Sequence, residues 1–90
     1  MAVAERMVEI VNPLGLHARP SAEFVKLASQ FHSEVSLTKD GMDVNGKSIM
    51  GVMTLAAECG SQLKIRAEGD DAEAAASALA ALVSKGFSEV

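Results

Sequence analysis

The segment Gly15-Leu16-His17-Ala18-Arg19-Pro20 places a histidine two residues before an arginine, and a proline directly follows that arginine. Proline has no N–H group, and its φ is already close to the helical value, so it fits best in the first turn of a helix. We therefore expect a helix to begin at Ala18 or Arg19. His17 would then stand just outside the N-terminal end of that helix.

This placement of His17 suits an imidazole that accepts and gives away a phosphoryl group. The first N–H groups of a helix have no internal acceptor and lie at the positive end of the helix dipole, so they favour a bound dianion. Arg19 adds a guanidinium that can bridge two phosphate oxygens. A histidine beside a helix start is also often just a solvated or capping residue. The local chemistry of this segment leaves both interpretations open.

Hydrophobic periodicity predicts the elements that position this segment. Alternating residues predict strands at 7–11, 34–39, 42–44 and 62–67. Apolar residues at helical spacing predict helices at 18–31, at 49–55 after a capping Ser48, and from Asp70 or Asp71 to about Lys85. Asp70 and Glu73 have the spacing of a capping box, and Gly86 is a suitable stop.

The predicted order of elements is βαββαβα. Strands with one apolar face, alternating with helices that have one apolar stripe, predict an α/β (α+β) open-faced β-sandwich. This fold is a four-stranded antiparallel sheet with three helices on one face. A chain of 90 residues is expected to form a single domain, residues 1–90.

Composition narrows the possible functions. A net charge of −4 disfavours binding to nucleic acid or to an anionic membrane surface. The single cysteine, Cys59, cannot form an internal disulfide, the first residues lack the apolar core of a signal peptide, and no apolar run could span a bilayer. We expect a cytoplasmic protein with no cofactor and no metal, since neither metal-ligand spacing nor a glycine-rich nucleotide loop is present.

A second motif, Lys47-Ser48-Ile49-Met50-Gly51-Val52-Met53, follows at the start of the expected short helix. Together with the histidine segment and the βαββαβα order, it makes nearly the whole chain resemble HPr, the histidine-containing phosphocarrier family of the bacterial phosphotransferase system. The resemblance implies that His17 is phosphorylated on its Nδ1 (pros) nitrogen by enzyme I, which is itself charged from phosphoenolpyruvate. His17 would pass the group to enzyme IIA-type acceptor proteins, as in sugar transport.

The resemblance also implies a stoichiometric carrier, not an enzyme, in which Arg19 and the backbone N–H of Ala18 hold the phosphate. A monomer that makes transient contacts fits this role best. Ser48 matches a serine that HPr kinase/phosphorylase modifies in many members of the family. As a helix N-cap, Ser48 also has a purely structural role, and both roles are compatible.

Ile49, Met50 and Met53 are the candidate docking residues, because the family presents this helix beside the active histidine and methionines adapt to several partners. Burial in the core is an equally good explanation for any one of them. Lys26 and Lys47 are candidates for steering acidic partners, with ordinary solvated lysines as the alternative.

Leu14 departs from the pattern of the sugar-pathway members, which often carry a small polar residue at this position. The nitrogen-regulatory branch of the family therefore stays an alternative. A regulatory binding module that acts through Ser48 and the apolar residues, without phosphotransfer, is the other alternative. Family members of that kind lack the active histidine, whereas His17 is present here.

Overall fold

The computed structural model describes residues 2–88, whose elements follow the expected order βαββαβα. The strands are β1 (Val3–Glu9), β2 (Glu34–Lys39), β3 (Met42–Asn45) and β4 (Gln62–Glu68). The helices are α1 (Ala18–Ala28), α2 (Ile49–Thr54) and α3 (Ala72–Ser84), and a short 3-10 turn follows at Gly86–Ser88. The four strands form one antiparallel sheet in the order β1-β4-β2-β3, which confirms the predicted fold class.

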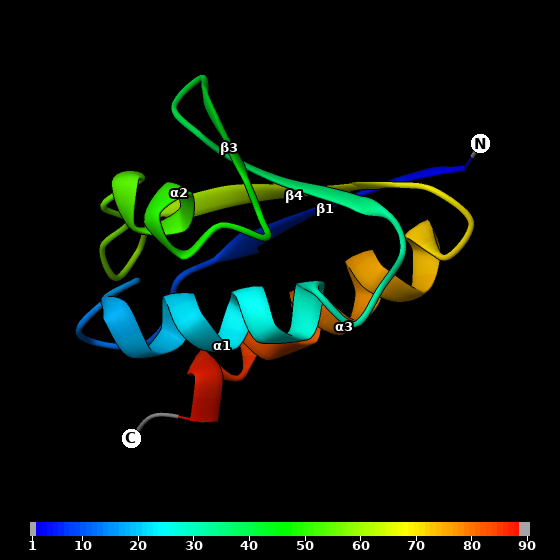
Figure 1. Cartoon of the computed structure of the whole chain (residues 1–90). Helices are drawn as coiled ribbons and strands as arrows, with labels where there is room; N and C mark the ends of the chain where they lie inside the picture. The colour runs from blue at the N-terminus through cyan, green and yellow to red at the C-terminus, as the bar shows by residue number, and fades with distance from the viewer. Residues whose placement is uncertain (1, 89–90) are drawn as a thin grey trace.

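The two longer helices, α1 and α3, run side by side beneath the sheet and leave its other face open (Figure 1). Strand β4 shows how the sequence produces this arrangement. Leu63, Ile65 and Ala67 are buried toward the helices, while the alternate residues Lys64 and Arg66 lie on the open face. The predicted alternation of the fourth strand is therefore confirmed.

The core lies between the sheet and the two long helices and is aliphatic apart from two aromatic rings. Phe24 from α1 and Phe87 from the C-terminal turn are its largest fully buried side chains. Leu79 and Val83 of α3 are also fully buried. Burial of this apolar surface is the main favourable contribution to folding.

The first strand differs from its predicted range of 7–11, because β1 covers Val3–Glu9. It pairs with β4 over its whole length, from Val3 opposite Glu68 to Glu9 opposite Gln62. The backbone pairing, which alternation cannot reveal, brings residues 3–6 into the strand. Three other strand or helix ends shift by a single residue: β3 ends at Asn45, β4 ends at Glu68, and α2 ends at Thr54.

Helix α1 ends at Ala28, three residues before the predicted end at Phe31. Ser29 forms the C-cap, and the N–H groups of Gln30 and Phe31 donate to Leu27 and Ala28 in tighter turns. Phe31 still packs against the core. Because Phe31 is apolar and packs against the core, it fits the helical spacing of apolar residues even though it lies beyond the end of the helix.

The predicted capping box at the start of α3 is wrong. The N-cap residue is Asp71, and its side chain makes no capping hydrogen bond. Its carboxylate instead accepts hydrogen bonds from the hydroxyl and N–H of Ser33 and from the N–H of His32. These bonds, the Ser33 hydroxyl first, lower the pKa of Asp71 from 3.8 to about 2. Glu73 pairs with Arg6 of β1 and so links α3 to the sheet edge.

The predicted stop of α3 at Gly86 is confirmed. Lys85 is the C-cap, and Gly86 follows with φ of +66°, a left-handed conformation in which glycine has no Cβ to strain. The chain then turns back and buries Phe87 beneath the helix end. The C-terminal turn therefore closes one side of the core.

Candidate functional site

His17 is the N-cap residue of α1, as the position of Pro20 predicts. Its backbone is extended, with φ of −76° and ψ of −171°, and its side chain makes no capping hydrogen bond. The side chain is partly exposed, whereas Pro20 is buried in the first turn. The imidazole is thus fixed to the mouth of the helix without being used to cap it.

The first turn of α1 offers two backbone N–H groups toward the region of the imidazole. Ala18 and Arg19 are the first two helical residues, Pro20 has no N–H, and the N–H of Ser21 already donates to the His17 carbonyl at 3.1 Å. No acidic side chain lies in this turn. The Arg19 side chain is exposed. Both the helix dipole and the guanidinium favour an anion here.

The loop before His17 is held by the loop between α2 and β4. The Leu16 N–H donates to the Ala57 carbonyl at 2.8 Å. A Cβ on Gly15 would stand 2.4 Å from the same carbonyl oxygen, and Gly15 has φ of +69°. The buried Asn12 side chain donates to the Gly15 carbonyl at 2.7 Å. Hydrogen bonds therefore fix the conformation of this loop, and that conformation requires glycine at position 15.

Helix α2 carries the second motif. Ser48 is its N-cap, and its hydroxyl oxygen accepts from the Gly51 N–H at 3.0 Å, which confirms the predicted cap. Ile49, Met50 and Met53 are 43%, 77% and 40% exposed, while the core contact of this helix is made by the fully buried Val52. These three exposed residues, called the α2 patch below, form an apolar surface.

Helix α2, which carries the α2 patch, lies beside the N-terminal half of α1. Helices α1 and α2 contact each other, and Figure 1 shows α2 above the first turns of α1. Leu14, in the loop before His17, is 77% exposed and adds to the apolar surface near this end of α1. An exposed apolar surface beside the histidine is the kind of feature that marks a protein-binding site.

The two candidate lysines differ. Lys26 is exposed in the last turn of α1. Lys47 is only partly exposed, because its ammonium group donates to the Phe31 carbonyl at 2.8 Å. That bond joins the loop before α2 to the turn that follows α1. Lys47 therefore has a structural contact that the sequence did not predict.

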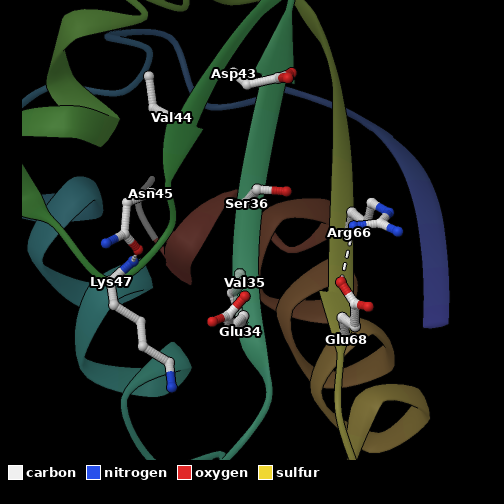
Figure 2. Close-up of a pocket in the computed structure, with 9 residues that line it drawn as sticks. All are labelled: Glu34, Val35, Ser36, Asp43, Val44, Asn45, Lys47, Arg66 and Glu68. Atoms are coloured by element: carbon white, nitrogen blue, oxygen red, sulfur yellow. Dashed lines mark hydrogen bonds and ion pairs between the residues drawn. The ribbon is translucent and has the colours of Figure 1, made fainter. Parts of the chain in front are cut away.

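A hollow of about 490 Å³ lies on the open face of the sheet and is lined mainly by residues of β2, β3 and β4 (Figure 2). Its lining mixes charges of both signs, with Glu34 and Glu68 opposite each other on β2 and β4. Arg66, which also lines it, pairs with Glu68 and with Glu5 of β1. Neither His17 nor the α2 patch lines this hollow.

Within residues 2–88, no three His, Cys, Asp or Glu side chains are grouped so that they could hold a metal ion. The same part of the chain contains no helix long and apolar enough to cross a membrane. Cys59 is an exposed free thiol whose Sγ lies 3.7 Å from the Val11 carbonyl oxygen.

An open-faced sheet with a histidine at the mouth of its first helix is the architecture of the small phosphocarrier proteins. The family model described as "PTS HPr component phosphorylation site" matches residues 4–85. The chain belongs to this HPr family of phosphocarriers.

Individual relatives agree with this assignment. Phosphocarrier protein HPr of Treponema pallidum is 48% identical over 93% of this chain and 96% of its own. The crystal structure of HPr from Thermoanaerobacter tengcongensis has a TM-score of 0.92 at 48% identity and covers 97% of this chain and 98% of that one. The crystal structure of Crh from Bacillus subtilis, described as a swapped dimer, has a TM-score of 0.76 at 47% identity over 88% of this chain and 91% of that one.

Three residues near His17 have contacts or roles in the structure that the sequence did not predict. Ala57 provides the carbonyl that holds the histidine loop, Ser21 bonds back to that loop, and Leu14 extends the exposed apolar surface. Only Leu14 had a signal in the sequence, since it is an apolar residue between a proline and a glycine in a loop. The contacts of Ala57 and Ser21 depend on tertiary packing and leave no pattern in the sequence.

Proposed function

We propose that His17 is the covalent site of this phosphocarrier and takes the phosphoryl group on Nδ1 from phosphorylated enzyme I. The proposal depends above all on one observation, the placement of His17 as the N-cap of α1 with an imidazole that does not cap the helix. The lone pair of the ring nitrogen forms the new N–P bond while the N–P bond of the donor breaks. The group then passes to an enzyme IIA-type acceptor by the same exchange.

Arg19 and the N–H of Ala18 stabilise the phosphoryl oxygens in this proposal. Phosphoryl transfer requires in-line positioning and charge stabilisation on three oxygens more than it requires a base. A guanidinium and the unpaired N–H groups of a first helical turn provide this stabilisation. The partner provides the remaining groups. The protein is therefore a stoichiometric carrier that turns over only within a chain of partners.

The α2 patch, with Leu14, is the proposed docking surface for enzyme I and for the acceptors. Methionine side chains adapt their shape to different apolar surfaces, so one patch can serve several partners in turn. Lys26 and Lys47 add positive charge at the rim and attract acidic partners. The protein works as a monomer in this proposal, although the related Crh has been solved as a dimer.

Ser48 is the proposed regulatory site, modified by an HPr kinase/phosphorylase. Its hydroxyl lies at the start of α2, directly before the exposed Ile49 and Met50. A phosphate there adds a charge of about −1.5 to −2 beside an apolar surface that must lose its water to dock. Phosphorylation of Ser48 therefore weakens docking and slows the charging of His17.

Two alternatives have observations in their favour. The exposed Leu14 supports the nitrogen-regulatory branch, which accepts non-polar residues at this position. The similarity to Crh supports a regulatory binding module that acts through Ser48. The module would bind partners without receiving a phosphoryl group on His17, and the following experiment separates it from the carrier.

The purified protein is incubated with enzyme I, phosphoenolpyruvate and magnesium, and its intact mass is measured before and after acid treatment. We expect one acid-labile phosphoryl group on the wild type and none on His17→Ala. His32→Ala, which removes the other histidine, is the matched control and should be labelled fully. A label that survives His17→Ala, or no label on the wild type when a known HPr is charged in parallel, contradicts the carrier proposal.

A further inference from the structure

Ser21 is a fully buried polar side chain at the start of α1 that the proposed transfer does not use. It is 0% exposed, and its hydroxyl donates to the Leu16 carbonyl at 3.2 Å. A buried hydroxyl loses its hydration and must be hydrogen-bonded to avoid a large cost. This bond therefore explains how a serine is accommodated at a core position of α1.

The backbone of Ser21 makes the complementary bond. Its N–H donates to the His17 carbonyl at 3.1 Å. The Leu16 carbonyl belongs to the peptide plane that precedes the His17 Cα, and the His17 carbonyl belongs to the plane that follows it. Ser21 thus holds both peptide planes on either side of His17, one through its side chain and one through its backbone.

The two peptide planes determine the direction in which the His17 side chain leaves the backbone. Their orientations set φ and ψ of His17 and therefore the direction of its Cα–Cβ bond. The N–H bond to His17 is the ordinary i to i−4 bond of a helix, which any residue except proline at position 21 would make. The hydroxyl bond to Leu16 lies outside the helix and requires this side chain. The preceding plane is the one that the serine controls.

Leu16 is held by contacts other than the bond from Ser21. Its N–H donates to the Ala57 carbonyl at 2.8 Å, and its side chain is buried. Loss of the Ser21 hydroxyl leaves the Leu16 carbonyl without this donor in a buried environment. Rotation of the Leu16–His17 peptide toward another donor would relieve that cost and would turn the His17 Cβ away from its position.

We propose that Ser21 is a positioning residue for phosphoryl transfer, which fixes the direction of the His17 side chain through the Leu16 carbonyl. The proposal rests on His17 being the phosphorylated residue. Ser21 touches neither the phosphoryl group nor the partner. Its effect is on the fraction of molecules whose imidazole is aligned for in-line attack, a geometric requirement to which transfer rates are sensitive.

The experiment compares two buried serines. Ser33 is 1% exposed and donates its hydroxyl to Asp71, beyond the opposite end of α1. Ser33→Ala also removes a buried serine hydroxyl and its hydrogen bond, in this case to a carboxylate, without touching the histidine loop. With enzyme I in excess, we expect Ser21→Ala to lower the maximal rate of His17 phosphorylation about tenfold with an unchanged KM for enzyme I, because the α2 patch is intact. Ser33→Ala should retain the wild-type rate.

A second substitution at position 21 ensures that the test does not depend on Ser21→Ala alone. Ser21→Cys keeps the shape of the side chain but offers only a weak donor, so it should lose rate as Ser21→Ala does. Thermal unfolding checks that each variant is folded at the assay temperature. A wild-type rate in either folded Ser21 variant, or an equal loss in Ser33→Ala, overturns the proposal.

A measurement on the unphosphorylated protein separates the positioning role of Ser21 from the proposal that His17 is phosphorylated. Three-bond Hα–Hβ couplings of His17, measured by NMR on the unphosphorylated protein, should indicate one χ1 rotamer in the wild type and in Ser33→Ala. Ser21→Ala should give rotamer-averaged values. If averaging is seen in Ser21→Ala while the wild type accepts no phosphate, the carrier proposal fails, and what stands is that Ser21 fixes the direction of the His17 side chain. Unchanged couplings in Ser21→Ala overturn the positioning role even if His17 is phosphorylated.

Discussion

The Leu16 N–H donates to the Ala57 carbonyl oxygen at 2.8 Å and fastens the loop that presents His17 onto the segment between α2 and β4. This bond links the histidine motif to the loop after the second motif, because Ala57 lies three residues beyond the end of α2 at Thr54. The position of the histidine therefore depends on α2 as well as on α1.

Gly15→Ala tests this fastening. The new Cβ would stand 2.4 Å from the Ala57 carbonyl oxygen, at a residue whose φ is +69°. We expect a loss of about 2 kcal/mol in the free energy of unfolding from the clash and the backbone strain together. Urea denaturation measures it. Gly41→Ala also has a positive φ but an open surrounding, so it should cost less; equal losses would mean that the close approach is unimportant.

Arg19→Ala tests the proposed phosphate contact. The side chain is exposed, so the thermal midpoint should stay within about 1 °C of wild type, since surface changes cost little. The rate of His17 phosphorylation should fall on the order of 10- to 100-fold through loss of a charge-assisted contact. Rapid quench-flow experiments with phosphorylated enzyme I measure this rate. Lys26→Ala removes a similar exposed charge from the other end of α1 and should reduce the rate far less.

Met50→Ser tests the α2 patch. Met50 is 77% exposed, so the substitution should leave stability nearly unchanged while the KM for enzyme I rises about tenfold. Steady-state phosphorylation assays give KM and kcat separately. Met7→Ser is the matched control, because Met7 is 65% exposed on the open face of the sheet. A similar rise in KM for Met7→Ser would place docking elsewhere.

Ser48 can be tested for its cap and its regulation separately. Ser48→Ala removes the acceptor for the Gly51 N–H and should cost about 1 kcal/mol of stability. Ser48→Asp restores an acceptor and adds a negative charge beside the α2 patch, so stability should recover while the KM for enzyme I rises several-fold. Ser84→Asp adds the same charge on α3. Unchanged KM in Ser48→Asp would argue against interference with docking.

Asp71 makes stability depend on pH at the acidic end. Its pKa falls from 3.8 to about 2 on folding, chiefly through the Ser33 hydroxyl and the His32 N–H. Between these values the unfolded chain binds more protons than the folded one, so the stability from Asp71 is present above pH 3.8 and is lost as pH falls toward 2. Asp71→Asn should flatten this part of the urea-denaturation profile. Ser33→Ala, which removes the hydroxyl that contributes most to the lowered pKa of Asp71, should flatten it in part.

Much of the fold was predictable because periodicity reports burial directly. The alternation of Leu63, Ile65 and Ala67 predicted β4, and the position of Pro20 predicted the start of α1 with His17 at its mouth. The wrong prediction at the start of α3 has a tertiary cause. Asp71 has a capping residue's identity, yet its carboxylate bonds to a loop far away in the sequence. Local pattern does not reveal which of two available partners a side chain takes.

For the candidate site as well, local sequence features were predictable and tertiary contacts were not. His17, Arg19 and Ser48 could be singled out as candidates from residue types and spacing, whereas the exposure of Met50 could not, because burial in the core was an equally good expectation. The bonds of Ser21 to Leu16 and of Lys47 to Phe31 were not predictable either, because each acceptor is a backbone carbonyl that any residue could have provided. Supporting contacts of this kind become visible only when the chain is folded.

The position of β1 at the edge of the sheet, paired with β4, sets when the protein can begin to work. During synthesis the histidine segment leaves the ribosome early, but the strand that pairs with β1 and the carbonyl of Ala57 that seats Leu16 emerge much later. Such non-local pairing delays folding until the distant partner exists. Under the proposed function, a nascent chain therefore displays His17 before the loop that presents it has its folded shape, and we expect it to accept a phosphoryl group only after β4 has emerged.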